Sequence, residues 1–349
     1  MEEKKSSEVL LDVRDLTFSF NTYAGEVQAV RGVSFTLEKG KSLGIVGESG
    51  CGKSVTAKSL IRLNPEKPKG IYKKGEVLFD GRDLMAMSEK EMQKVRAQEI
   101  RMIFQDPMTS LNPTMTIGKQ IMEGIMKYGD KTKEEAKKIA LETLALAGIP
   151  SPEDRFKQYP HEFSGGMRQR AMIALAMAVN PKLLIAAEPT TALDVTIQAQ
   201  ILDLIKDIQK KYDTALIMIT HDLGVVANIA DNIAVMYAGK IVEYGSAEDI
   251  FKHPGHPYTW GVLQSIPPED TSNREPLHPI LGSPPDLFNP PKGCPFAARC
   301  PHTMKVCNQM YPTSYDLEGE DHWCSCWLYH PKAKDTVNPI TGEGVVRSE

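Results

Sequence analysis

The sequence predicts an α/β fold in which helices cover a parallel β-sheet, and three observations support this prediction. Short apolar runs that suit buried strands lie at 43–46, 183–186 and 215–219. A helical pattern lies between the last two runs, where 197–208 carries one apolar face. Strand, helix and strand follow one another with short connections, an order that is typical of a parallel sheet.

Length and composition limit the kind of protein. The chain has 349 residues, of which 41% are hydrophobic and 25% charged, with a net charge of −4. This length fits one large domain and a smaller one, and the charge disfavours a nucleic-acid partner. No apolar run approaches the ~20 residues that span a bilayer. No apolar signal core follows residues 1–5, so we expect a cytoplasmic chain that reaches a membrane only through partner proteins.

The first elements are expected to be strands within 9–46. Residues 9–13 and 29–37 have strand-like patterns, and 43–46 is a short apolar run bounded by glycines. A helix should follow over about 53–63, because Asn64-Pro65 ends it.

The middle of the chain, from about 106 to 159, is predicted to be helical. Thr132 and Glu135 have the spacing of a capping box, and alanines and leucines follow at helical spacing. Gly148 fits the end of that helix.

Residues 47–54 match the pattern of a phosphate-binding P-loop between a strand and a helix. Its glycines let backbone N–H groups surround phosphates, Lys53 supplies charge to them, and the Ser54 hydroxyl suits Mg²⁺. The helix N-terminus adds partial positive charge. Many NTPases share this pattern, so it predicts nucleotide binding without giving the class. The nucleotide-binding residues predicted here are Gly47, Ser49, Gly50, Cys51, Gly52, Lys53, Ser54 and Val55.

Four further motifs give the class. The first is Gln105, which follows a predicted strand, and the second is Ser164-Gly165-Gly166 within residues 163–170. The third is the segment from Glu188 to Asp194, and the fourth is His221 within residues 220–222. In this order they resemble the Q-loop, signature, catalytic glutamate with D-loop, and switch histidine of the ABC ATPase family. The resemblance covers about residues 8–255, with Met167 where glutamine is commoner.

This resemblance implies the fold and the assembly. The fold is a P-loop ABC ATPase domain at 8–258, with a helical insertion at about 106–165 and an antiparallel edge subdomain near the N-terminus. Two such subunits dimerise head to tail, so each ATP lies between the P-loop of one subunit and the Ser164-Gly165-Gly166 turn of the other.

The resemblance also implies roles for single residues. Glu188 polarises the attacking water and His221 contacts the γ-phosphate. Gln105 binds Mg²⁺ together with Ser54 and senses the membrane subunit, and Asp194 belongs to the nucleotide site. Such phosphoryl transfer works by positioning and charge stabilisation.

The adenine is expected to stack on an aromatic side chain. Phe20 matches the family's position after its first strand, and Tyr23 in the same loop can substitute for it. The sequence does not choose between them.

A narrower resemblance reaches the C-terminal end. Residues 105–107, 110–113, 256–259, 294–296 and 299–301 resemble the ATPases of dipeptide and oligopeptide importers, whose relatives include nickel importers. This implies a peripheral subunit on the cytoplasmic side of a prokaryotic membrane. It also implies a homologous ATPase or second copy, two membrane permease subunits and an extracytoplasmic peptide-binding protein. The substrate, a dipeptide, an oligopeptide or a nickel chelate, stays open.

The C-terminal region, 259–349, begins near a proline-rich stretch and is rich in cysteine, so it should need a metal to hold its shape. Cysteine chemistry alone allows zinc, an iron–sulfur cluster or unligated thiols. The importer resemblance favours a [4Fe–4S] cluster with a structural role, with zinc as the alternative. Its ligands are then Cys294, Cys300, Cys307 and Cys326, and Cys324 is a small buried hydrophobe.

One residue departs from the family pattern. The strand before Glu188 usually ends in aspartate, but this chain has Ala187. That carboxylate supports Mg²⁺ through its water shell, so we expect ATP binding with impaired hydrolysis. We favour a substitution that traps ATP over a native residue in a subunit whose partner hydrolyses.

Two other functions compete with peptide import. A soluble DNA-repair ABC ATPase would carry a long coiled coil, and the chain has no heptad stretch. A regulatory metalloprotein would only bind nucleotide, and normal hydrolysis after Asp is restored at 187 would argue against it.

Overall fold

The computed structural model describes residues 8–65, 69–191, 193–266, 279–319 and 321–346. The chain divides into two compact units, which are described separately. The first unit comprises Met1–Leu11, Thr36–Ser42 and Leu78–Ile219, and the second comprises Asp12–Phe35, Leu43–Val77 and Thr220–Glu349. The prolines at 267, 268 and 276 lie outside the described residues, as does Ala192.

The first unit has a parallel sheet in the order β8-β7-β6. These strands are β6 (Ile100–Ile103), β7 (Leu183–Ala187) and β8 (Ala215–Thr220). Every residue of β7 is buried, as its uninterrupted apolar sequence predicts. The helix α8 (Val195–Tyr212) buries one predicted face through Ile201, Ile205 and Ile208.

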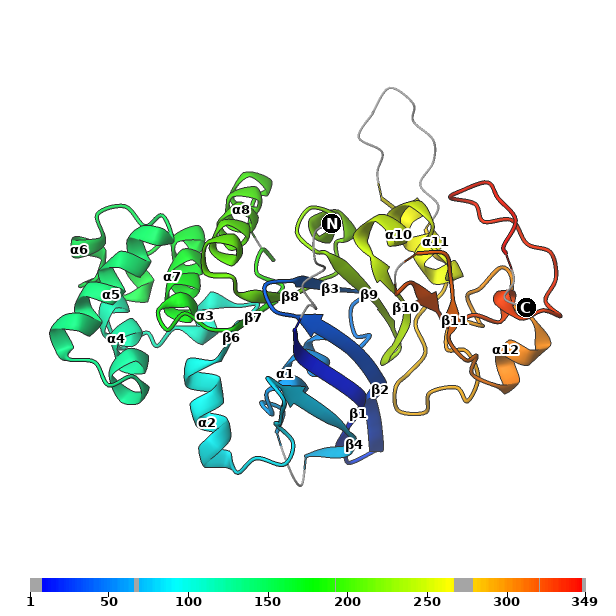
Figure 1. Ribbon diagram of the computed structural model, residues 1–349, viewed down its shortest axis with the longest axis horizontal. Coiled ribbons are helices and arrows are strands. Elements are labelled where there is room, and N and C mark those ends of the chain that lie inside the picture. The colour runs from blue at the N-terminus through cyan, green and yellow to red at the C-terminus, as the bar shows by residue number, and fades with distance from the viewer. Residues whose placement is uncertain (1–7, 66–68, 192, 267–278, 320, 347–349) are drawn as a thin grey trace, which may run out of the picture. The chain divides into compact units, whose positions relative to one another are not determined.

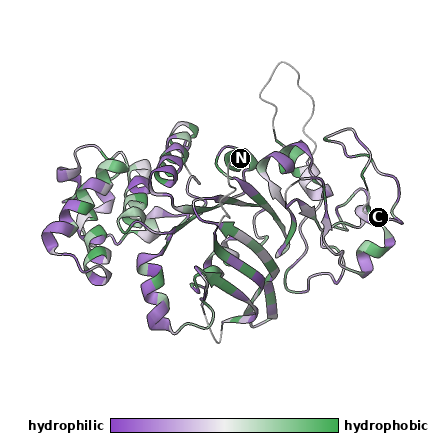
Figure 2. Ribbon diagram, in the orientation of Figure 1, coloured by the Kyte–Doolittle hydropathy of each residue, from purple (hydrophilic) through white to green (hydrophobic). Residues whose placement is uncertain are grey.

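A group of helices forms the rest of the first unit (Figure 1). They are α2 (Glu89–Gln98), α3 (Pro107–Ser110), α4 (Ile117–Tyr128), α5 (Lys133–Leu146), α6 (Pro152–Arg155), the 3₁₀ helix η1 (Pro160–Glu162) and α7 (Gly165–Met177). Both α4 and α5 carry hydrophilic and hydrophobic residues (Figure 2), and their apolar sides share a core with α7. The predicted helical stretch and its capping box, Thr132 with Glu135, are confirmed.

The second unit holds most of an N-terminal sheet and part of a longer one. The N-terminal sheet contains β1 (Val9–Thr22), β2 (Gly25–Glu38) and β4 (Gly70–Phe79), in the order β2-β1-β4. The last residues of β4 pair antiparallel with β5 (Arg82–Asp83).

The longer sheet joins the P-loop strand to the C-terminal region. Its order is β11-β12-β10-β9-β3. The strands are β3 (Ser42–Val46), β9 (Asn232–Tyr237), β10 (Lys240–Ser246), β11 (Tyr315–Asp316) and β12 (Trp323–Cys324). Within it β3 and β9 are parallel, and the hairpin β11-β12 adds to the edge of β10, with Cys324 opposite Glu243.

The helices of the second unit are short. They are α1 (Lys53–Leu60), α9 (Leu223–Ala227), α10 (Ala247–Lys252), α11 (Pro257–Gln264), α12 (Lys305–Gln309) and the 3₁₀ helix η2 (Trp327–Tyr329). In the described part of the chain, no helix is both long and apolar enough to cross a membrane.

The helix α1 ends about one turn earlier than predicted, at Leu60. Arg62 adopts a left-handed conformation with φ of 52°, and the amides of Arg62 and Leu63 donate back to the carbonyls of Ser59 and Lys58. This is a Schellman ending with arginine in place of the usual glycine, so no glycine marks it in the sequence.

Candidate functional site

The predicted P-loop lies between β3 and α1, as its pattern requires. Gly47 and Gly52 have φ values of 151° and 106°. A Cβ at Gly47 would collide with the Met236 carbonyl, and one at Gly52 with the Ala29 carbonyl. Only glycine therefore fits these two positions, where the loop turns tightly against its own unit.

Lys53 is held inside this loop. Its side chain is buried, and its Nζ donates to the carbonyls of Gly47 at 2.7 Å and Glu48 at 3.0 Å. Gly52 caps α1 in a left-handed conformation, and Ser54 and Val55 lie in the first turn. The ammonium group and the positive end of α1 thus lie in the same loop, an arrangement that attracts phosphate.

Ser49, Gly50 and Cys51 complete the loop. Ser49 and Gly50 are exposed, whereas Cys51 is buried. Burial raises the pKa of the Cys51 thiol, so this side chain is a neutral packing group and not a reactive thiolate.

In the first unit, two predicted catalytic residues meet. Gln105 follows β6, Glu188 follows β7, and Gln105 Nε2 donates to Glu188 Oε2 at 2.9 Å. The Thr191 hydroxyl donates to the same oxygen at 3.0 Å. Because the Gln105 nitrogen is engaged, its Oε1 is the atom that can serve Mg²⁺ as an oxygen ligand.

Glu188 stands on an unusual backbone. Its φ is 49°, a left-handed value that costs energy for residues other than glycine. Its amide donates to the Ile219 carbonyl at 2.8 Å. Ala187, the last residue of β7, is buried and pairs with Ile219 of β8. The chain turns away from the strand directly after it, at Glu188. The sequence did not reveal this conformation.

The signature and D-loop residues begin two different helices. Ser164 caps α7, accepting from the Met167 amide at 3.3 Å, and Gly165 and Gly166 form the first turn. Asp194 caps α8 by accepting from the Ile197 amide at 3.0 Å. Ser164 and Gly165 are exposed, as a residue that contacts another subunit must be.

In the second unit, His221 is exposed directly after β8 and before the cap of α9, Asp222. This confirms its predicted place after a buried strand.

The location predicted for Phe20 was wrong. Phe20 lies within β1, because this strand continues to Thr22, and its ring packs edge-on against Phe18 with centroids 4.9 Å apart. Tyr23 lies in the turn after the strand and is fully exposed. Of the two, Tyr23 therefore has the ring that is open to a ligand.

Four of the five C-terminal cysteines surround one cavity. It is small, with a volume of about 20 Å³, and Cys294, Cys300, Cys307 and Cys326 all line it. Burial raises the pKa of Cys294 to about 11 and that of Cys300 to about 12, so binding of a metal would release protons. Cys324 is fully buried elsewhere, against Trp260 and Tyr329, and confirms its prediction as a small apolar group.

Two buried polar atoms of residues that line this cavity have no hydrogen-bond partner among the described residues. They are His256 Nε2 and Thr303 Oγ1, both buried. The Tyr258 amide donates to His256 Nδ1 at 3.0 Å, so the ring proton is on Nε2. The cavity therefore combines four thiols with two donors, which suits a bound group that has acceptor atoms. Among the described residues, no three His, Cys, Asp or Glu side chains are grouped to hold a single metal ion.

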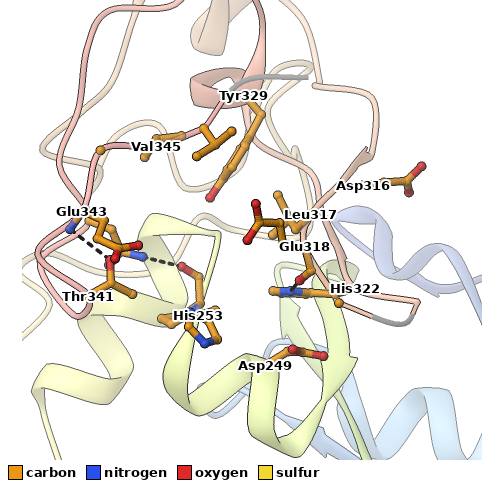
Figure 3. Close-up of a pocket in the computed structure, with 15 residues that line it drawn as sticks. Asp249, His253, Asp316, Leu317, Glu318, His322, Tyr329, Thr341, Glu343 and Val345 are labelled. Carbon is orange, nitrogen blue, oxygen red and sulfur yellow. Dashed lines mark hydrogen bonds between the residues drawn. The ribbon is translucent and has the colours of Figure 1, made fainter. Parts of the chain in front are cut away.

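A second pocket lies elsewhere in the C-terminal region. It contains about 1290 Å³ of empty space including its open mouth, and its lining includes Asp249, Glu318 and Glu343 (Figure 3). None of the residues predicted for nucleotide or metal lines it.

The sequence did not predict which residues support the P-loop. Arg299 Nη1 and Nη2 donate to the two Glu48 carboxylate oxygens at 2.7 and 3.0 Å. The Glu48 amide donates to the Tyr258 hydroxyl at 2.9 Å. Burial opposes the charge on Arg299, but Glu48 and Tyr237 together raise the pKa of its guanidinium. Both supporting residues belong to motifs that the sequence analysis singled out, at 256–259 and 299–301, but the sequence did not show that these motifs contact the P-loop.

Comparisons with known proteins identify the family of the chain. Residues 30–191 match the ABC transporter family, and residues 242–307 match the C-terminal region of oligopeptide and dipeptide transporters. The oligopeptide transport ATP-binding protein OppD of Bacillus subtilis is 60% identical over 95% of this chain and 92% of its own length. The dipeptide transport ATP-binding protein DppD of the same organism is 55% identical over 95% and 98%.

A solved structure has a similar fold. It is a dimeric ATP-binding cassette in a post-hydrolysis state, bound to ADP and Pi. The TM-score is 0.61 and the identity 25%, over 68% of this chain and 99% of that one.

Proposed function

Because this chain belongs to the ABC transporter family, as an ATP-binding subunit of the oligopeptide and dipeptide type, we propose that its P-loop and Glu188 drive peptide import. Its activity is ATP hydrolysis coupled to peptide transport. The residue assignment rests on two local arrangements of side chains. One is the glycine loop around Lys53, and the other is the Gln105–Glu188 hydrogen bond.

In this mechanism Lys53 and the loop amides bind the phosphates, while Ser54 and Gln105 Oε1 bind Mg²⁺. Mg²⁺ neutralises phosphate charge when it is bound. Glu188 holds and polarises the attacking water, and His221 contacts the γ-phosphate. The Ser164-Gly165-Gly166 turn and Asp194 of a second subunit complete each site, and Tyr23 stacks on adenine with Phe20 as the alternative. The exposed N-terminal turn of α7 supports the role for Ser164.

We further propose that Ala187 slows hydrolysis without preventing ATP binding. A methyl group at the end of β7 cannot hold the water shell of Mg²⁺, whereas Lys53, Ser54 and Glu188 are all present. The buried position of Ala187 beside Glu188 supports this reading, since a carboxylate there would lie next to the catalytic group.

The cysteine cavity is proposed to hold a [4Fe–4S] cluster, with zinc as the alternative. Four thiols around one cavity match the four ligands of such a cluster. The unpartnered His256 Nε2–H and Thr303 hydroxyl support it, because cluster sulfurs accept hydrogen bonds. A cluster would join the segments that carry its four ligands, so its proposed role is structural.

The partners proposed are a homologous ATPase or a second copy, two membrane permease subunits and, indirectly, an extracytoplasmic peptide-binding protein. The chain would then work as a peripheral subunit on the cytoplasmic side of the membrane. The names of the relatives support peptides as cargo, in preference to a nickel chelate.

The test is reconstitution of the full chain with its permease subunits in proteoliposomes. ATP-dependent uptake of a labelled peptide is expected, and it should disappear in the Lys53→Ala variant. Peptide uptake that is independent of this subunit, or transport by a lone monomer, would overturn the proposal.

A further inference from the structure

Two side chains, one from the start of α11 and one from the C-terminal region, hold one residue of the P-loop. The Tyr258 hydroxyl accepts from the Glu48 amide at 2.9 Å, and Arg299 binds both oxygens of the Glu48 carboxylate at 2.7 and 3.0 Å. Tyr258 and Arg299 come from the two C-terminal motifs, and Arg299 directly precedes Cys300. The loop that should bind phosphate is therefore attached to the region that contains the cysteines.

Arg299 is itself fixed. Its side chain is 6% exposed, and Nη1 also donates to the Tyr237 hydroxyl at 3.1 Å. Its Nε donates to the Leu281 carbonyl and its Nη2 to the Ile280 carbonyl. A planar guanidinium held on several sides is a rigid support, so the bidentate pair fixes the Glu48 side chain.

The charge of Glu48 makes this support necessary. Its carboxylate belongs to the segment between Gly47 and Lys53, where the polyphosphate of a nucleotide should lie. An unpaired carboxylate there would repel the phosphates, and its partial burial would make the lost partner costly. Arg299 neutralises this charge, and Tyr258 fixes the backbone from which the charge extends.

We propose that Arg299 and Tyr258 are positioning residues of the nucleotide site, through which the C-terminal region sets the affinity for ATP. The inference rests on the P-loop role proposed above. It assigns to the C-terminal motifs an effect on ATP binding that is separate from holding a metal.

The test measures equilibrium binding of Mg²⁺·ATP to the full chain. Arg299→Gln should weaken binding about tenfold, because it leaves the Glu48 carboxylate unpaired. Glu48→Gln alone should bind at least as tightly as the parent chain. The double variant, Glu48→Gln with Arg299→Gln, should return to within about threefold of the parent, since the repelling charge is gone.

Tyr258→Phe tests the backbone contact by removing one oxygen atom, and it should weaken binding about threefold. Tyr329→Phe is its matched control. That hydroxyl is also buried in the C-terminal region, but it donates to the Gly255 carbonyl and not to Glu48, so ATP affinity should stay unchanged.

Parental affinity in Arg299→Gln and Tyr258→Phe would overturn the inference. A double variant as weak as Arg299→Gln would also overturn it, because Arg299 would then act only on general structure. If the Arg299→Gln variant does not fold, the ATP affinity of Tyr258→Phe is compared with that of Tyr329→Phe, and equal affinities would overturn the inference. The Lys53→Ala variant distinguishes a failure of this inference from a failure of the proposed function. Undiminished ATP binding in that variant would reject the P-loop assignment itself.

Discussion

Gln105 donates a hydrogen bond of 2.9 Å from its amide to Oε2 of Glu188, although 83 residues separate them. They follow β6 and β7, which are adjacent and parallel, so their side chains leave the same edge of the sheet. The contact fixes a carboxylate beside an amide oxygen that can bind Mg²⁺. The group proposed to polarise water and the proposed Mg²⁺ ligand are thus held together by a direct contact.

Glu188→Gln should lower ATP turnover by about 100-fold or more, because the group that polarises water is lost. ATP affinity should persist, since the P-loop is unaltered. The comparison is best made in the Ala187→Asp background, by phosphate release and nucleotide binding. Unchanged turnover would remove Glu188 from its proposed role.

Ala187→Asp should raise turnover by about 10–100-fold, because a second ligand shell for Mg²⁺ is restored. Ala187→Asn is the matched control, with nearly the same shape and no charge, and should recover much less. Both are measured with the same partner subunit over a range of Mg²⁺ concentrations. Equal rates for parent and Ala187→Asp at saturating Mg²⁺ would show that the aspartate is dispensable here.

Cys326→Ser should lose iron, whereas Cys324→Ser should keep it. The first thiol lines the cavity and the second is buried in an apolar cluster outside it. Anaerobically purified parent protein should contain about four irons per chain and absorb broadly in the visible range, as iron–sulfur proteins do. Zinc without iron in such preparations would favour the alternative metal.

Thr303→Val and His256→Asn should each make the reduction potential of the bound cluster more negative. Each removes a buried donor from a residue that lines the cavity, and hydrogen bonds to cluster sulfurs are among the influences that set the potential. Asparagine can still cap α11, so the His256 variant should fold. The reduction potential is measured by redox titration, and the iron content of each variant is the control. Unchanged potentials in both variants would contradict the expectation.

Dimerisation should require ATP and an intact Ser164. The isolated chain should be mainly monomeric, and ATP should shift it to dimers when Glu188→Gln blocks hydrolysis. Ser164→Arg should bind ATP normally and stay monomeric, because the bulky charge occupies the contact turn. Light scattering with and without ATP measures this, and ATP-driven dimers of the Ser164→Arg variant would exclude the turn from the interface.

Local patterns predicted much of the fold. The buried strands at 43–46, 183–186 and 215–219 needed only an apolar run, and the helix after Thr132 needed only its capping box. Departures arose where backbone geometry lacked a sequence signal. Arg62 ends α1 in a glycine-like conformation, and β1 continues past Phe20 because strand pairing outlasts the apolar pattern.

The candidate site was predictable where motif spacing determines it, but not where distant segments meet. The P-loop and the place of Glu188 after β7 follow from local sequence. The φ of Glu188 and the attachment of Glu48 to Tyr258 and Arg299 do not, because those contacts join residues 210 and 251 positions apart. Such pairs carry no periodicity that a single sequence can reveal.

The Glu48–Arg299 pair also has a consequence for the order of synthesis. A ribosome adding about 5–20 residues per second needs roughly 12–50 s to make the 251 residues between them. Throughout that interval the nascent P-loop carries its carboxylate without the guanidinium that neutralises it. A chain released before Arg299 would therefore contain every ATPase motif and still lack the guanidinium that pairs with Glu48.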